Sequence, residues 1–365
     1  MGIEKGSGGQ QAQSVRCLSF HADYGCQNSG ACCSSGWEVA VETRVELGLR
    51  SRLRSGVARL PNGPDGFRPA ADPPSGCRSA LRLHEPSGSC WFRDDEARRC
   101  AIHREFGWSA LPAACQQFPR VCVLEPDSVS ISLSHYCPTA AGLLFRQEGG
   151  FDVVQDPPAF PRSWPFEGLD ARFAHPPFLR PRVLLGFDGL RTFEEEAIAA
   201  LSEPPVFESL GRIEQATRAF RAWRPALGPL VALIRASFRN RESFGPGLSV
   251  ADPRSVLSAS LPRGSAGDRR LPVFSDAAPT FPPMVDLALR RYLAARLIAA
   301  WIMFQAEDIA AVVRYLRLCL DTVLLFRSMG NRDEARVEPW KEAIRSADLW
   351  LLHHCDPDLL ARNLG

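Results

Sequence analysis

Two stretches of the N-terminal third decide the fold class: CLSFHADYGCQNSGACCSSGW over residues 17–37 and CWFRDDEARRCAIHREFGWSALPAACQQFPR over residues 90–120. The chain has 12 cysteines, and all except Cys319 and Cys355 lie between Cys17 and Cys137. In a reducing compartment, such clustering indicates metal binding more often than disulfides. Thiolates are soft, charged ligands, and four of them suit zinc or an iron–sulfur cluster. The sequence therefore predicts a metal centre in the N-terminal part.

The rest of the sequence shows neither a secretory signal nor a membrane span. Residues 1–14 lack the apolar run of a signal peptide. The most apolar helix candidate, Met284 to Gln305, contains Asp286 and three arginines, which is too polar for a span of roughly 20 residues. The formal net charge is only +2, which gives no indication of a nucleic-acid partner. We therefore expect a cytoplasmic protein without a membrane span and without a nucleic-acid partner.

Composition divides the chain into four parts. Residues 1–14 are rich in Gly, Gln and Ser and are expected to be disordered. Residues 15–150 form the cysteine-cluster module, residues 151–182 are a proline-rich linker or surface arm, and residues 183–365 are a helical region. The predicted fold class is mainly α: a loop-rich cysteine-cluster module with short helices and strands, followed by a helical C-terminal region.

Several elements can be predicted from periodicity and capping signals. Val129 to Leu133 alternates apolar and polar residues, which indicates a half-buried strand. The sequence T-F-E-E from Thr192 has the form of a capping box and predicts a helix start there. The other predicted helices are Trp37–Arg54, Leu210–Arg239 with bends at its two prolines, Met284–Gln305, Ala306–Met329 and Val337–Leu360.

The spacing of the cysteines does not match the common metal motifs. There is no C-x2-C pair, so the zinc-ribbon pattern is absent. Cys32 and Cys33 are adjacent, and consecutive side chains of an extended chain point to opposite faces. Either these two cysteines serve two different sites, or one of them ligates a metal and the other packs. Both alternatives are open at this point.

Four short motifs around the cysteines carry a resemblance to a known family. They are CSSGW over residues 33–37, LP before Cys115, FPR over residues 118–120, and SISLSHYCP over residues 130–138. Together with the cysteine pattern, they resemble the cysteine-cluster family of zinc- or iron-chelating domains, and within it the flagellin lysine-N-methylase branch. The match covers about 120 residues in separate blocks.

The resemblance implies a metal centre, a cofactor and a substrate. The cofactor of the centre would be zinc or an iron–sulfur cluster of the 4Fe-4S kind. Its implied ligands are Cys17, Cys26, Cys32, Cys33, Cys90, Cys100, Cys115 and Cys137. Cys77 and Cys122 fall outside the pattern and are interpreted as packed thiols. For His21, His103 and His135 near the cysteines, we favour surface or hydrogen-bonded roles over metal binding.

For the methylase branch, the resemblance further implies transfer of methyl groups from S-adenosylmethionine to lysines of flagellin or another filament protein. No Gly-rich turn of the dinucleotide-binding type is present, so the sequence indicates neither a cofactor pocket nor a catalytic residue. Two other functions are compatible with the same cysteines. One is a non-catalytic zinc- or iron-binding module whose helical half binds a partner, and the other is a redox or metal-handling protein.

Overall fold

A computed structural model describes residues 13–54, 60–70, 75–85, 87–240, 253–260, 281–329 and 336–365. Helices make up 51% of the structure and strands 14%, so the fold is mixed α/β rather than mainly α. The prediction of a helical C-terminal half is confirmed. Nearly all of the segment that was expected to be disordered, residues 1–14, lies outside the described residues. None of the helices in the described ranges is long and apolar enough to cross a bilayer.

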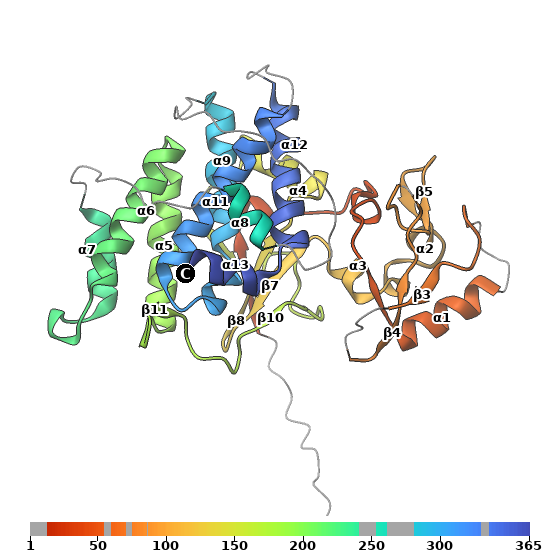
Figure 1. The fold of residues 1–365 in the computed structure, drawn as a ribbon, viewed down its shortest axis with the longest axis horizontal. Coiled ribbons are helices and arrows are strands. Elements are labelled where there is room, and N and C mark those ends of the chain that lie inside the picture. Colours follow the sequence, from red (N-terminus) through yellow and green to blue (C-terminus); the bar gives the residue numbers. More distant parts are fainter. Residues whose placement is uncertain are drawn as a thin grey trace, which may run out of the picture.

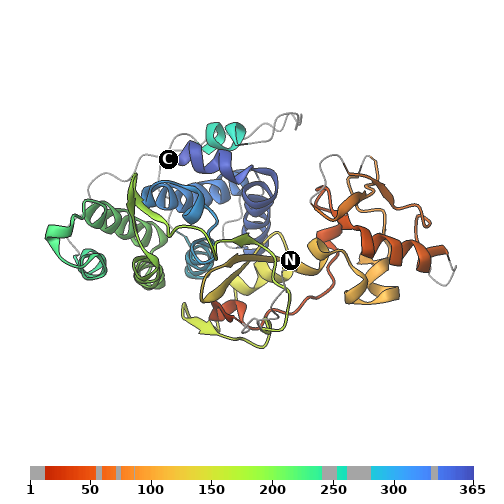
Figure 2. The same ribbon diagram turned by 90° about the horizontal axis from the view of Figure 1, so that it is seen from below.

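The described chain folds into two lobes (Figure 1). We call residues 31–117 the small lobe and the other described residues the large lobe. Figures 1 and 2 both show the small lobe, with α1 (Thr43–Arg54), standing beside the rest of the molecule. Each lobe has its own buried cluster of apolar side chains, centred on Phe92 and Ile102 in the small lobe and on a helical bundle in the large lobe.

The small lobe is built from short elements. Its three-stranded sheet has the order β2 (Ala40–Glu42), β4 (Cys77–Leu81), β3 (Phe67–Pro69), with all pairs antiparallel. Its other elements are η2 (Ala31–Cys33), β5 (Arg93–Asp94), β6 (Arg99–Cys100), α2 (Ala101–Phe106), η3 (Trp108–Ala110) and α3 (Ala113–Gln117). The expected helix over Trp37–Arg54 thus begins only at Thr43, because Ala40–Glu42 pair with β4 instead.

The large lobe contains a five-stranded sheet with the order β10–β7–β8–β1–β9. Its strands are β1 (Ser14–Leu18), β7 (Arg120–Leu124), β8 (Ser128–Leu133), β9 (Val153–Gln155) and β10 (Leu169–Asp170). The prediction of a strand over Val129–Leu133 is confirmed, but every residue of β8 is buried, so the expected half-exposure is wrong. The physical reason is that β8 lies in the middle of the sheet, and α9 covers it closely enough for the Ser132 hydroxyl to donate to the Ala295 carbonyl at 2.5 Å.

The proline-rich segment, residues 151–182, packs on this sheet. It supplies the two edge strands β9 and β10, and its Phe160 is fully buried in the core of the sheet. Two strands of the predicted cysteine-cluster module are therefore paired with a segment outside it: β1 with β9, and β7 with β10. A small ribbon of β11 (Phe178–Arg180) and β12 (Val183–Leu184) then leads into the helices.

All helices of the large lobe except the short η1 lie between residue 138 and residue 364. They are η1 (Ser19–His21), α4 (Pro138–Leu144), α5 (Phe187–Ser202), α6 (Val206–Arg221), η4 (Pro225–Leu227), α7 (Leu230–Arg239), α8 (Pro253–Ala259), α9 (Pro283–Leu297), α10 (Ile302–Gln305), α11 (Ile309–Ser328), α12 (Val337–Asp348), the π-helical turn η5 (Leu349–His354) and α13 (Pro357–Leu364). The bends expected at Pro225 and Pro229 are a complete break between α6 and α7.

The prediction of a helix start at Thr192 is wrong, since α5 begins five residues earlier at Phe187. The Thr192 hydroxyl donates to the Asp188 carbonyl inside the helix instead of capping it. Glu194 is buried and forms ion pairs with Arg16 and Arg191, so its carboxylate serves a contact with β1. Thr192 and Glu195, the two residues of the apparent capping box, thus both lie inside α5 and not at its start.

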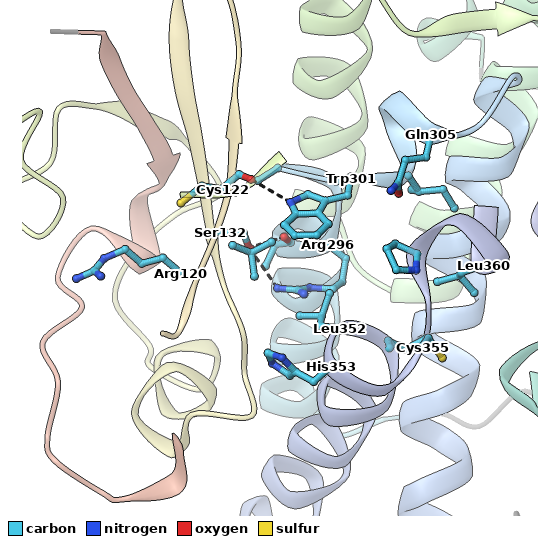
Figure 3. A pocket seen from close by; sticks show the side chains of 18 of the residues that line it. Arg120, Cys122, Ser132, Arg296, Trp301, Gln305, Leu352, His353, Cys355 and Leu360 are labelled. Atoms are coloured by element: carbon cyan, nitrogen blue, oxygen red, sulfur yellow. Dashed lines mark hydrogen bonds between the residues drawn. The ribbon is translucent and has the colours of Figure 1, made fainter. Parts of the chain in front are cut away.

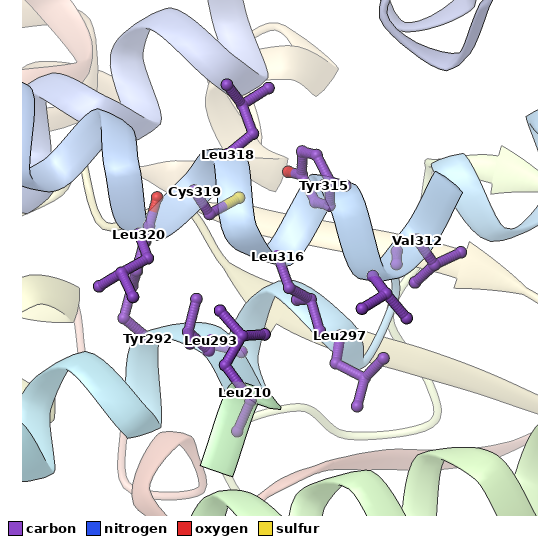
Figure 4. Packing of buried hydrophobic residues seen from close by; sticks show 14 of the residues in the cluster. Leu210, Tyr292, Leu293, Leu297, Val312, Tyr315, Leu316, Leu318, Cys319 and Leu320 are labelled. Atoms are coloured by element: carbon purple, nitrogen blue, oxygen red, sulfur yellow. The ribbon is translucent and has the colours of Figure 1, made fainter. Parts of the chain in front are cut away.

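Helices α6, α9 and α11 form the centre of the large core. In Figure 4, Leu210 of α6 lies against Leu293 and Leu297 of α9, next to Leu316 of α11. All four leucines are fully buried. Burying one such side chain stabilises the fold by about 1.5–3 kcal/mol, so this bundle has a core that does not depend on the cysteines of the small lobe.

Candidate functional site

Six cysteines line one cavity of about 100 Å³ where the two lobes meet; we call it the cysteine cavity. They come from five separate segments of the chain. The cysteines are Cys26, Cys32, Cys33, Cys100, Cys115 and Cys137. None of the chain's cysteines forms a disulfide in the structure, and all of them lie in described residues. The clustering in the sequence therefore becomes a clustering in space.

Local backbone features bring these thiols together. The 3-10 turn η2 carries Cys32 and Cys33, and it begins at Gly30, which has a φ of +69°. A Cβ at Gly30 would lie 2.4 Å from the carbonyl oxygen of Arg98, so this close approach requires glycine. Cys100 and Cys137 precede α2 and α4, where backbone N–H groups of the first turn point towards their sulfurs.

The sulfur atoms within the small lobe are in contact with one another. The Sγ atoms of Cys32 and Cys33 are 4.0 Å apart, so the turn puts both thiols on one side of the chain. Cys90 lies beside them, because its backbone N–H donates to the Cys33 carbonyl at 2.7 Å. The sequence left open whether Cys32 and Cys33 serve two different sites. In the structure both cysteines line the same cavity, which argues against two different sites.

The thiols perturb one another's pKa values. Contacts with Cys100, Cys32 and Cys90 raise the pKa of Cys33 far above its usual value. The contact with Cys33 lowers the pKa of Cys100 to about 7 and also lowers that of Cys32. Burial raises the pKa of Cys115 well above its usual value, and neighbouring thiolates add to this effect. Neighbouring thiolates repel one another, and a bound cation offsets this repulsion, so a metal would allow several of these thiols to be deprotonated together.

The cysteine cavity does not have the geometry of a preformed single-ion site. Within the described part of the chain, no group of three or more His, Cys, Asp or Glu side chains is placed so that it could hold one metal ion. A cavity of about 100 Å³ is also far larger than one zinc ion. In a 4Fe-4S cluster, by contrast, each thiolate binds a different iron, so the cysteine sulfurs surround a space and do not converge on a point.

The remaining cysteines lie elsewhere. Cys17 is fully buried in β1, where its thiol donates to the Leu18 carbonyl, and it does not line the cysteine cavity. Cys122 is buried in β7, and Cys77 is half-buried in β4. Cys319 and Cys355 are packed among the helices of the large core.

The histidines near the cysteines separate into two groups. His103 of α2 lines the cysteine cavity. His21 and His135 are fully buried in the large lobe, with their Nε2 atoms 3.2 Å apart. His135 Nδ1 lies 3.1 Å from Asp348, which also accepts a hydrogen bond from Tyr292 at 2.8 Å. These two histidines belong to a polar network that joins β8, α9 and α12.

Arg120 stands at the boundary of two cavities, and it belongs to the FPR motif. Its Nη1 donates to the Gln116 carbonyl at 2.7 Å, and its guanidinium lies 4.1 Å from the ring centroid of Trp164. No carboxylate among the described residues lies within ion-pair distance of it, and its Nε is buried without a hydrogen-bond partner there. Burial lowers the pKa of Arg120. The sequence gives the residue, but only the fold places this uncompensated charge beside the thiols.

Aromatic side chains join the lobes around the cysteine cavity. Trp37 of the small lobe stacks on His353 of η5 with ring centroids 4.3 Å apart, and it also contacts Tyr136 edge-on. Trp108 of η3 stacks on Trp164 at 5.8 Å. Such aromatic pairs add about 0.5–1.5 kcal/mol each beyond their buried area, so they hold the two lobes against each other.

A second, larger cavity of about 510 Å³ lies on the other side of α3, and we call it the α9–α10 pocket (Figure 3). Ala114 and Gln117 of α3 line this pocket, whereas Cys115 and Gln116 of the same helix line the cysteine cavity. One short helix thus separates the two. The other walls are β7, β8, the end of α9, α10, η5 and α13. No local pattern of residues predicts this pocket, because its lining residues come from distant segments.

Comparison with known proteins adds no assignment. Neither a model of a protein family, nor a curated protein, nor a solved structure matches the chain.

Proposed function

We propose that the protein holds an iron–sulfur cluster in the cysteine cavity. The observation that carries the proposal is that six cysteines from five segments surround one enclosed space at the junction of the lobes. Cys32, Cys33, Cys100 and Cys115 would hold the cluster, with Cys90 beside Cys33. When bound, a cluster of this kind supplies one-electron transfer, with a potential set by its charge and its hydrogen bonds.

The charges around the cavity suit a negatively charged centre. A cluster bound by four thiolates carries net negative charge, and buried charge needs a partner. Arg120 lines the cavity and has no carboxylate partner among the described residues. The backbone N–H groups of His103 and Ile102 point at the Cys100 sulfur, which stabilises its thiolate form. Arg120 would thus offset the negative charge of the cluster, and the first turn of α2 would orient the Cys100 ligand.

The test is to purify the full chain without oxygen and measure iron, zinc and acid-labile sulfide. We expect iron and sulfide in similar amounts, together with a brown colour. Zinc without sulfide would overturn the cluster and replace it by a zinc site. Absence of both metals would overturn the metal centre altogether.

Matched cysteine variants show whether the metal lies in the cysteine cavity. Cys33→Ser removes the thiol that contacts three others, and we expect it to lose most of the bound iron. Cys77→Ser changes a half-buried thiol of β4 that does not line the cavity, and we expect it to keep its iron. Equal iron in both variants would mean that the cluster lies elsewhere.

A second proposal is methyl transfer from S-adenosylmethionine to lysines of flagellin or another filament protein. It is supported by the place of the motif residues that carry the resemblance to flagellin lysine-N-methylases. Phe118 and Arg120 line the cysteine cavity. Trp37 and Tyr136, which are distant from Phe118 in the sequence, pack on its ring with centroids 5.5 and 6.5 Å away.

Mass spectrometry of filament proteins from cells with and without the gene tests this second proposal. We expect methylated lysines only where the gene is present, and their loss in cells that carry Cys33→Ser. Identical spectra, with iron-loaded protein present, would leave the non-catalytic metal-binding module or the redox and metal-handling function. Those two are distinguished by whether the centre can be reduced and reoxidised reversibly.

A further inference from the structure

The α9–α10 pocket has the size and the lining of a small-molecule site. Its volume of about 510 Å³ lies within the range of roughly 300–1,000 Å³ that is typical of ligand pockets. The lining is mainly apolar, with many small residues that leave room, including Ala114, Ala295, Ala299 and Ala300. Ala299 has a φ of +58°, an uncommon conformation for a residue other than glycine, and it leads the chain from α9 to Trp301.

Trp301 provides a fixed flat surface in this pocket. Its indole Nε1 donates to the Cys122 carbonyl of β7 at 2.9 Å, so the ring is held against the sheet. The side chain nevertheless remains 36% exposed, which is unusual for a residue anchored in this way. Figure 3 shows the ring between the Cys122 carbonyl and the Gln305 side chain. A ring held on one edge and open on a face is suited to stacking with a flat ligand.

Two hydrogen-bond acceptors flank Trp301. Gln305 follows it by four residues, so both side chains lie on one face of α10. The Gln305 amide nitrogen donates to Asp358 at 3.1 Å, which fixes its oxygen as an acceptor, and that oxygen is buried without a partner in the described chain. Glu167 supplies the second acceptor of the lining, and its neighbour Gly168 packs so closely on the Cys122 carbonyl that a Cβ at Gly168 would approach that oxygen to 2.2 Å.

The two arginines of the lining offer no uncompensated charge to a ligand, so the charge that remains is the carboxylate of Glu167. Arg296 is buried and lines the pocket, but Asp348 lies 3.6 Å from its guanidinium, which also donates to the Leu133 carbonyl and to Ser132. Figure 3 shows the Arg120 guanidinium directed away from the pocket, so only its aliphatic part borders the space. The ligand part bound here is therefore expected to carry no negative charge and to bring hydrogen-bond donors for Gln305 and Glu167.

We propose that the α9–α10 pocket binds a purine nucleoside, or a molecule built on one, with the base stacked on Trp301. Of the flat molecules without negative charge, this class carries amino N–H donors for the Gln305 oxygen on the base and hydroxyl donors for Glu167 on the sugar. An acceptor that is buried without a donor is costly, so a ligand that brings the donor gains affinity. The inference rests on the pocket alone and does not require a metal centre.

The test is titration calorimetry of the full chain with adenosine. We expect a Kd on the order of 100 µM for a ligand of this size. N6,N6-dimethyladenosine has the same rings but no amino N–H, and it should bind at least about tenfold more weakly because the Gln305 oxygen stays unpaired. Equal affinity for the two ligands, or no binding of adenosine at millimolar concentration, would overturn the proposal.

Two tryptophan variants form a matched pair for the stacking step. Trp301→Ala should weaken adenosine binding at least about tenfold. Trp223→Ala serves as the control, because Trp223 also donates its indole N–H to a backbone carbonyl, that of Gly228 at 2.8 Å, but does not line the pocket. Gln305→Leu, with circular dichroism to verify folding, should weaken adenosine binding without affecting the dimethylated analogue. Unchanged binding in Trp301→Ala would contradict the assignment.

The metal content of the same samples separates this inference from the proposed function. Adenosine binding by a protein without iron would support the pocket and refute the cluster. Iron and sulfide without adenosine binding would refute only the pocket assignment.

Discussion

At the scale of single residues, the cysteine cavity depends on a close backbone contact as much as on its thiols. Gly30 begins the turn that carries Cys32 and Cys33, and it packs against the backbone of Arg98, next to Cys100. Any side chain at Gly30 would push this turn away from β6 (Arg99–Cys100) and separate the thiols of the two segments. The glycine therefore sets the distance between ligand-bearing segments, although it carries no chemistry itself.

We predict that Gly30→Ala lowers both stability and metal content more than Gly36→Ala does. Both glycines have a positive φ, +69° and +77°, so each variant bears the strain of an alanine in that conformation, roughly 1–2 kcal/mol. Only Gly30 adds a clash with backbone, since a Cβ at Gly36 would meet nothing within 4 Å. The measurement is the melting temperature together with bound iron. Equal losses in the two variants would show that strain alone, and not the contact with Arg98, matters.

At the scale of elements, α11 is a largely buried helix that nevertheless contains a carboxylate. Asp321 is only 15% exposed in its side chain and lies 3.3 Å from Arg317 one turn before it. Burial raises its pKa to about 6, more than the contact with Arg317 lowers it. Because the folded protein binds the proton more tightly than the unfolded chain does, stability falls as the pH rises from about 4 to about 6.

We predict that Asp321→Asn stabilises the protein at pH 7.5 and has little effect at pH 4. A shift of about two units corresponds to roughly 3 kcal/mol at a pH above both pKa values, which is an upper estimate for the gain. At pH 4, the carboxyl is neutral in the folded protein and only about half ionised in the unfolded chain, so the substitution removes little of this charge effect. Urea unfolding of the variant and the wild type at both pH values gives the difference directly. The same gain at both pH values would indicate improved packing instead of a removed charge.

At the scale of the whole molecule, the two lobes differ in what stabilises them. The large lobe has an extensive helical core and the five-stranded sheet. The small lobe has short elements, and five of its cysteines lie in or against its only buried cluster among the described residues. A metal centre can contribute about 10–16 kcal/mol, which equals or exceeds the stability of a typical domain at about 5–15 kcal/mol. The small lobe should therefore need its metal to stay folded.

We predict that chelation opens residues 31–117 to protease and leaves residues 120–240 and 281–329 protected. The strand β1 precedes the small lobe but pairs with β8 and β9 of the large lobe. After cleavage, the N-terminal peptide that contains Ser14–Leu18 should therefore stay bound and elute with the large fragment in size-exclusion chromatography. The control is digestion of protein that retains its metal. Loss of protection in both lobes together would mean that they unfold as one unit.

Part of this architecture is determined locally and can be read from the sequence. The grouping of ten cysteines, the strand at Val129–Leu133 and the helical C-terminal half follow from composition and periodicity, which act over a few residues. Helix boundaries are less local. Val337–Leu360 reads as one helix, yet it divides into α12, the π-helical turn η5 and α13, so that His353 can stack on Trp37 of the other lobe.

The sequence by itself determined that thiols would be concentrated in the N-terminal part and that helices would follow. Only the tertiary structure decided which thiols meet, because Cys17 went into a sheet with distant strands while Cys26 and Cys137 reached the cysteine cavity from the large-lobe side. The tertiary structure also forms the α9–α10 pocket, which Trp301 and Gln117 line together. The physical reason is that contacts between distant segments depend on the packing of whole elements, and no local pattern of residues records that packing.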